Sequence, residues 1–111
     1  MRKSDRLAPP DVLSAEAGDW WNRITSEYEL DDAGLLILRS GLEALDRMRE
    51  AQALIAKHGL VAPDRFGQLK PNPAATIERD SRMAMFGALK RLNLDLEPLQ
   101  DGPGRPPRGG K

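Results

Sequence analysis

Apolar residues recur at three- and four-residue intervals in three separate segments of the chain, which is the spacing of one face of an α-helix. The pattern predicts helices over residues 14–29, 32–58 and 73–93. The middle segment is the longest, and a continuous helix rising about 1.5 Å per residue would span roughly 40 Å there. We therefore predict an all-α fold, a three-helix unit whose second and third helices form a long central helical hairpin.

Capping residues mark where these helices begin and end. Ser14 suits the N-cap of the first helix, and Asp31 or Asp32 suits that of the second. Gly59 favours the left-handed conformation that stops a helix. After a turn-rich loop, Asn72 is a good N-cap, and the proline that follows it fits the first helical position. The loop therefore turns the second helix back toward the third.

The second and third helices carry more apolar surface than one partner helix needs. Leu36, Ile37 and Leu54 widen the stripe of the second helix, and Met83 and Phe86 widen that of the third. A chain of 111 residues builds only a modest core, so copies of itself would gain by burying this surface. We expect a homo-oligomer, and a head-to-tail contact closes into a ring when its rotation allows.

Two adjacent tryptophans lie in the first helix and do not easily fill one small core together. Trp20, Ile24 and Tyr28 share a face through their four-residue spacing, whereas Trp21 points about 100° away from Trp20. We expect one tryptophan in the core of the helical hairpin and the other at a subunit contact. Stacking on nucleic-acid bases is the alternative role, and the acidic neighbours weaken it.

Both ends of the chain lack helical patterning, and the residues nearest each terminus are basic. Residues 1–13 are predicted to be a flexible arm, and residues 14–94 a helical oligomerisation domain. Residues 95–111 hold four of the nine prolines and four of the ten glycines, a composition that predicts a disordered tail.

Charge and composition exclude several classes of function. The chain has 17 basic and 17 acidic residues, which disfavours an electrostatic grip on nucleic acid over the whole surface. It has no cysteine, one histidine (His58), no phosphate-binding glycine loop and no metal-binding motif. We expect no enzyme, cofactor, metal or membrane span, and a cytoplasmic protein.

The segment from Gly59 to Leu94 also carries a family resemblance. Gly59-Leu60-Val61, a short variable loop, Lys70-Pro71-Asn72-Pro73, a charged helix with Arg79 and Arg82, and a closing Leu92-Asn93-Leu94 follow one another in this order. The order and spacing resemble the small subunit of phage DNA-packaging terminases. The resemblance extends upstream to about residue 14 and so covers most of the chain.

The resemblance implies a non-enzymatic ring of about eight to eleven copies. Such a ring engages double-stranded DNA and recruits the large terminase subunit, which carries the ATPase and nuclease, in the cytoplasm of a bacterial host cell. The expected DNA contacts are Arg2, Lys3, Arg6, Arg65 and Lys70. The expected ring contacts are Trp21, Leu35, Leu38, Leu42, Leu45, Met85 and Leu89. The tail, with Arg105, Arg108 and Lys111, corresponds to the region offered to the large subunit.

The chain departs from the family pattern because we find no separate N-terminal DNA-binding domain. We therefore expect weak, largely sequence-independent DNA contact, as in headful packaging or in a phage-derived gene transfer particle. Two alternatives stay open: a helical adaptor protein without DNA binding, and a small DNA-binding regulator.

Overall fold

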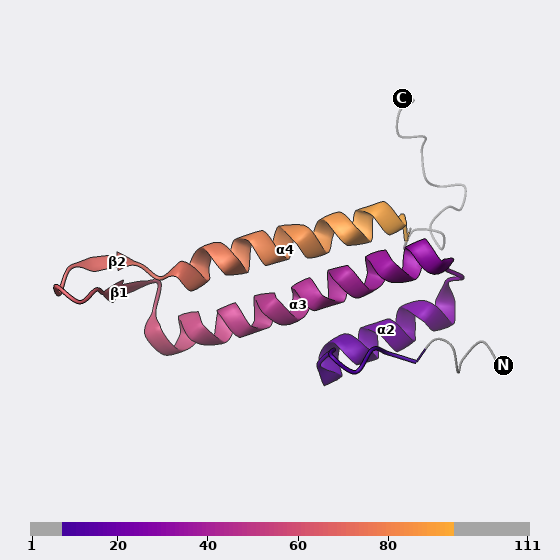
Figure 1. Cartoon of the computed structure of the whole chain (residues 1–111), viewed down its shortest axis with the longest axis horizontal. Helices are drawn as coiled ribbons and strands as arrows, with labels where there is room; N and C mark the ends of the chain where they lie inside the picture. Colours follow the sequence, from indigo (N-terminus) through magenta and orange to yellow (C-terminus); the bar gives the residue numbers. More distant parts are fainter. Residues whose placement is uncertain (1–7, 95–111) are drawn as a thin grey trace, which may run out of the picture.

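The computed structural model of the chain describes residues 8–94, and three helices make up most of this part. Helix α2 spans Ala15–Glu27, α3 spans Asp32–His58 and α4 spans Pro73–Leu92. Helices α3 and α4 lie side by side and antiparallel, and α2 packs against the first half of α3 (Figure 1). The all-α prediction is confirmed, with helix ends within two residues of those expected.

The predicted caps are present. Asp31 is the residue that caps α3, because its carboxylate accepts the Gly34 N–H at 2.8 Å. Gly59 has φ +85° and ends α3. Ser14 accepts the Ala17 N–H at the start of α2, so local sequence signals explain where α2 and α3 begin and where α3 ends.

Asn72 does more than begin α4. Its side-chain oxygen accepts the Ala74 N–H at 3.0 Å, and its amide nitrogen donates to the Gly59 carbonyl at 2.8 Å. Its backbone N–H donates to the Leu60 carbonyl at 2.7 Å. Because Asn72 is buried, these bonds close the chain at the point where α3 and α4 meet.

The segment between α3 and α4 was expected to be a loop, and the structure corrects this. Strands β1 (Val61–Pro63) and β2 (Leu69–Pro71) pair antiparallel, with Ala62 opposite Lys70. They form a short hairpin that projects beyond the ends of both helices (Figure 1). Strands of three residues that contain prolines lack the length and the alternation from which a strand is recognised in sequence.

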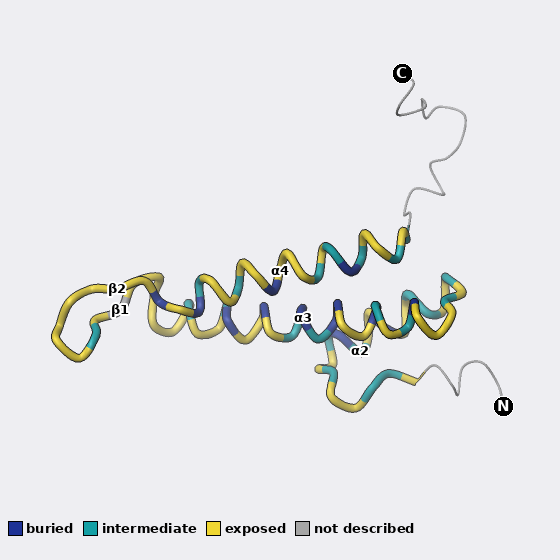
Figure 2. The backbone as a smooth tube through the Cα atoms, turned by 45° about the horizontal axis from the view of Figure 1, so that its top comes forward, coloured by how far each residue is buried: buried dark blue, intermediate teal, exposed yellow. Residues whose placement is uncertain are grey.

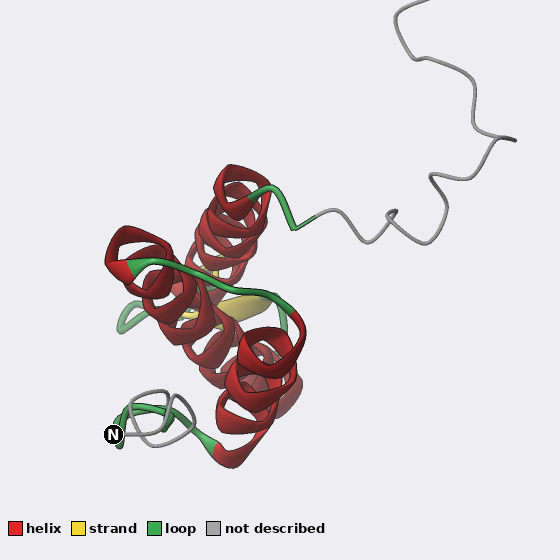
Figure 3. Ribbon diagram, turned by 90° about the vertical axis from the view of Figure 1, so that its right-hand side faces the viewer, coloured by secondary structure: helices red, strands yellow, loops and turns green. Residues whose placement is uncertain are grey.

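The core lies along α3, where buried positions line the sides that face the other two helices (Figure 2). Toward α4, Gly41 allows a close approach, because a Cβ added there would lie 2.8 Å from the Ala88 Cβ. Toward α2, the core cluster combines residues of α2 and α3: Ala17, Trp21, Leu38, Leu42, Leu45 and Met48. Helix α3 is thus the central element, with α2 and α4 on different sides of it (Figure 3).

Candidate interaction surfaces

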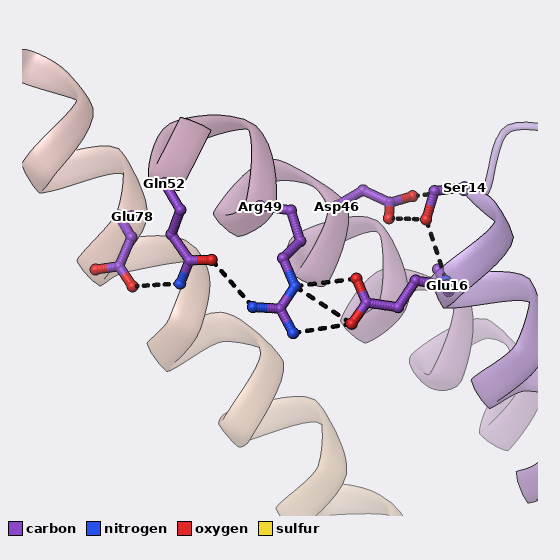
Figure 4. Close-up of polar contacts among 7 residues, drawn as sticks. Ser14, Glu16, Asp46, Arg49, Gln52 and Glu78 are labelled. Atoms are coloured by element: carbon purple, nitrogen blue, oxygen red, sulfur yellow. Dashed lines mark hydrogen bonds and ion pairs between the residues drawn. The ribbon is translucent and has the colours of Figure 1, made fainter. Parts of the chain in front are cut away.

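A chain of polar contacts sets the position of α2 on α3 and of α3 on α4 (Figure 4). The backbone N–H and the hydroxyl of Ser14 both donate to the Asp46 carboxylate. Arg49 binds Glu16 through two nitrogens, the closer at 2.8 Å. These contacts join residues that are 32 or 33 positions apart in the sequence, so they fix the alignment of α2 along α3.

The same chain of contacts continues to α4. Arg49 donates to the Gln52 side chain at 3.0 Å, and Gln52 donates to the Glu78 carboxylate at 3.2 Å. The hydrogen bonds from Arg49 hold the pKa of Glu16 below its usual value, and the Glu16 carboxylate raises the pKa of Arg49. All three described helices are therefore joined by one polar network as well as by the apolar core.

The β-hairpin between α3 and α4 is ordered by its own turn. The Asp64 carboxylate accepts the N–H groups of Phe66 and Gln68 at 2.8 and 3.0 Å, and Gly67 adopts φ +82°. This is a three-residue hairpin loop with a glycine at the left-handed position. The turn holds Phe66 at the tip with 79% of its surface exposed.

One face of this hairpin is apolar and exposed. Side chains of a strand alternate between faces, and Val61 pairs with Pro71 while Pro63 pairs with Leu69. All four of these residues are exposed. In the described part of the chain these side chains stay exposed, so the hairpin presents a small apolar surface.

The edges of the hairpin are poorly suited to pairing with another strand. Asp64 N–H donates to Gln68, and Asn72 N–H donates to Leu60, so hydrogen-bonded pairs alternate with pairs whose backbone groups point outward. Pro63 and Pro71 occupy outward positions, one on each strand, and neither has an N–H to donate. The outward backbone groups of the hairpin therefore offer few sites for strand addition, and its exposed surface consists mainly of side chains.

Two of the five predicted DNA contacts lie on this hairpin. The Arg65 guanidinium lies 5.3 Å from the centre of the Phe66 ring at the turn. Lys70 lies on β2, with its ammonium 3.7 Å from the Asp64 carboxylate. The structure thus brings Arg65 and Lys70 onto one element, but Asp64 partly neutralises Lys70. The other three, Arg2, Lys3 and Arg6, lie outside the described residues.

The predicted docking residues for a large subunit, Arg105, Arg108 and Lys111, also lie outside the described residues. Within residues 8–94, no three carboxylate or histidine side chains come close enough to hold a metal ion. None of the described helices has the length and the apolarity needed to cross a membrane.

Most of the predicted ring contacts lie inside the chain itself. Trp21, Leu38, Leu42 and Leu45 are buried in the core of the chain itself, and Trp21 is only 6% exposed. Leu35 and Met85 are partly buried against the same core, and Leu89 is half-buried. These side chains are largely buried in the contacts that join the three helices. The stripe of α3 that was read as a subunit contact is therefore mostly an internal one.

Trp20, and not Trp21, is the exposed tryptophan. Trp20 is 43% exposed, whereas Trp21 packs with Ala17 one turn earlier in the core. Ile24, which shares the Trp20 side of α2 through four-residue spacing, nevertheless packs partly against the core. The residue that marks the buried face of α2 in the sequence is Ala17, because an alanine allows α2 to approach α3 closely.

The outward side of α4, which helical spacing alone did not identify, exposes large apolar side chains. Met83 and Phe86 are 65% and 55% exposed, one helical turn apart on the surface of α4. Arg79, Arg82 and Lys90 are exposed on the same helix. We call these five residues the α4 outer face.

Comparison of the chain with protein-family models, curated proteins and solved structures gave no significant match.

Proposed function

We propose that this chain is the small, non-enzymatic subunit of a DNA-packaging terminase from a phage or a phage-derived gene transfer particle. In this role it assembles into a ring, contacts DNA weakly and with little sequence preference, and recruits the large ATPase–nuclease subunit. The resemblance in the order and spacing of the motifs between Gly59 and Leu94 is the starting point of the proposal.

One structural observation supports it best. Two long antiparallel helices, α3 and α4, form a helical hairpin whose connection projects as an exposed element with two cations and an apolar face. A projecting element of this kind suits a multivalent ring, where weak contacts repeated in every copy act together. Exposed apolar side chains on α2 and α4 leave surface for contacts between copies.

DNA binding is tested by titrating double-stranded DNA at several salt concentrations. Each phosphate contact lowers the logarithm of the affinity by about 0.9 per tenfold increase in salt. Replacing Arg65 and Lys70 with alanine should weaken binding to every sequence alike and flatten the salt dependence. Arg39→Ala is the matched control, because Arg39 is an exposed cation on α3 that pairs with Glu43. A sequence-specific footprint that is insensitive to salt would contradict the proposal.

Recruitment of the large subunit is tested by co-purification. The full chain should retain the large subunit from the same packaging system. Replacing Arg105, Arg108 and Lys111 with glutamate should lose it without changing the helical content. Retention by this triple variant would move the docking site away from the tail.

A helical adaptor without DNA binding is the second candidate. The apolar face formed by Val61, Pro63, Leu69 and Pro71 favours it, because it is better suited to a protein than to phosphates. The ion pair between Lys70 and Asp64 points the same way. The salt titration separates the two candidates, since an adaptor would show no DNA affinity at low salt.

A further inference from the structure

The outward surfaces of α2 and α4 carry opposite charge and both expose large apolar side chains. The segment of residues 14–32, which contains α2, has six acidic residues and one basic residue. The segment of residues 73–94, which contains α4, has four basic and two acidic residues. Because α2 and α4 lie on different sides of α3 (Figure 3), the molecule has an acidic side and a basic side.

The acidic side is organised around Trp20. Asp19, Trp20, Arg23 and Glu27 are all exposed, and we call them the α2 outer face. Arg23 stacks over the Trp20 ring at 4.7 Å. In the part of the chain that the structure describes, neither Asp19 nor Glu27 has a salt-bridge partner. Asp19, next to Trp20, and Glu27, about two helical turns further along α2, thus remain available to cations from elsewhere.

The basic side is the α4 outer face. Arg82 pairs with Glu78 at 2.8 Å, and Arg79 approaches Asp80 at 3.4 Å, whereas Lys90 has no salt bridge within residues 8–94. Met83 and Phe86 lie among these cations. A methionine and a phenylalanine side by side suit an aromatic partner such as a tryptophan ring.

The two outer faces lie at the same height along α3. Trp21, the neighbour of Trp20, belongs to the core cluster with Leu38 and Leu42, and Met85 of α4 packs against that cluster. Trp20 and the second half of α4 are therefore level with each other on different sides of α3. Two copies placed side by side in the same orientation would bring one acidic face opposite one basic face.

We propose that the α2 outer face of one copy docks on the α4 outer face of the next copy, with Trp20 packed against Met83 and Phe86. Asp19 and Glu27 then face Arg82 and Lys90 of the neighbour. This inference rests on the proposed ring and identifies which surfaces build it. A second copy fits better than DNA, because the centre of the α4 outer face is apolar and its counterpart of opposite charge is present on the same chain.

The contact is heterologous, since two different surfaces meet. A chain of such contacts always leaves one acidic face free at one end and one basic face free at the other, so assembly continues until the rotation between copies closes it. A self-complementary dimer would instead use the same patch on both copies. The proposal therefore predicts an assembly of more than two copies.

The test uses charge reversal in the full-length chain. One variant carries Asp19→Lys and Glu27→Lys and therefore has two basic faces. The other carries Arg82→Glu and Lys90→Glu and therefore has two acidic faces. In native mass spectrometry, wild type should assemble, and each variant alone should assemble at least about tenfold more weakly, because like charges across an interface repel. An equimolar mixture of the two variants should assemble again, with both masses in the same particles.

Two single substitutions test the apolar part of the contact. Trp20→Ala should weaken assembly at least about 30-fold, as for a central aromatic residue in an interface. Leu36→Ala is the matched control, because Leu36 is exposed on α3 outside both outer faces, and it should change assembly by less than about twofold. Circular dichroism should show wild-type helical content in all variants, since every substituted side chain is exposed.

Several results would overturn the proposal. These are unchanged assembly of the charge-reversed variants, a mixture that fails to assemble, or Trp20→Ala behaving like Leu36→Ala. If the reversal on α4 reduced DNA affinity and left assembly intact, the α4 outer face would be a nucleic-acid surface instead. A monomeric wild-type chain would overturn this contact, while binding to DNA and to the large subunit would still be judged by the separate assays above.

Discussion

The close approach of α3 and α4 at Gly41 gives a quantitative test of the helical hairpin. A Cβ built on Gly41 would lie 2.8 Å from the Ala88 Cβ and 3.9 Å from the Met85 carbonyl oxygen. The first distance is far below the ordinary carbon–carbon contact of about 3.5–4.0 Å. Since both atoms belong to packed helices, neither can move away without shifting a backbone.

Two opposing effects decide the result of Gly41→Ala. Replacing a glycine inside a helix with alanine is favourable by about 1 kcal/mol, whereas overpacking a core contact costs about 1–3 kcal/mol. The net expectation is a loss of about 0–2 kcal/mol in the free energy of unfolding. In an Ala88→Gly background the collision is absent, so the same substitution should stabilise the protein by about 1 kcal/mol. The coupling between the two sites should therefore be about 1–3 kcal/mol.

Urea unfolding followed by far-ultraviolet circular dichroism measures all four members of this cycle. Every member is compared at one protomer concentration, because assembly would add to the apparent stability. Gly18→Ala is the matched control in α2, where the added Cβ would meet only the Pro9 side chain at 3.9 Å. It should stabilise the protein by about 0.5–1 kcal/mol. If Gly41→Ala were equally stabilising and showed no coupling to Ala88→Gly, the helices would not approach as closely as described.

Three further predictions follow from the core, the cap and the polar network. Leu38 is fully buried, so Leu38→Ala should lower the free energy of unfolding, measured by urea denaturation, by about 2–5 kcal/mol. A loss below about 0.5 kcal/mol would contradict the position of Leu38 in the core. Asn72→Ala should cost about 1–2 kcal/mol, because α4 loses its cap and its tie to the end of α3; Asn72→Asp keeps the cap oxygen and should cost less. The Glu16–Arg49 contact lowers the pKa of Glu16 in the folded protein. The contact therefore adds to the free energy of unfolding above the pKa of Glu16 in the unfolded chain, about 4.3. This stabilisation is lost as the pH falls through the lower pKa of the folded state. Thermal unfolding should therefore show wild type more stable than Glu16→Gln at neutral pH and the gap closing below about pH 4, whereas a gap independent of pH would argue against the contact.

Some of the architecture was predictable because its causes are local. A side chain that caps a helix bonds to a backbone N–H two or three residues away, as Asn72 and Asp31 do. A glycine with positive φ, such as Gly59, acts through its own backbone. Helical spacing of apolar residues likewise needs no information from elsewhere in the chain. The three helices and the turn back between α3 and α4 could therefore be read from the sequence.

The candidate surfaces were less predictable because they depend on which face each helix turns inward. Spacing alone placed Trp20 and Trp21 on different sides of α2 but did not say which one is buried. Ala17 and the contacts of Ser14 and Glu16 with α3 make that choice. Likewise, an apolar stripe on α3 looks the same whether its partner is α2 or another copy, so spacing alone could not show that Leu42 lies in the core of the chain.

Three properties could be read from the amino-acid sequence: the helical class, the positions and ends of the helices, and the presence of apolar residues beyond what one hairpin covers. These properties arise from interactions over a few residues, together with composition. Three other features became visible in the folded chain: residues 61–71 pair as a β-hairpin, Trp20 faces outward, and acidic and basic faces lie on different sides of α3. Those features depend on contacts between residues far apart in the chain, such as Arg49 with Glu16, whose geometry exists only after the helices have packed.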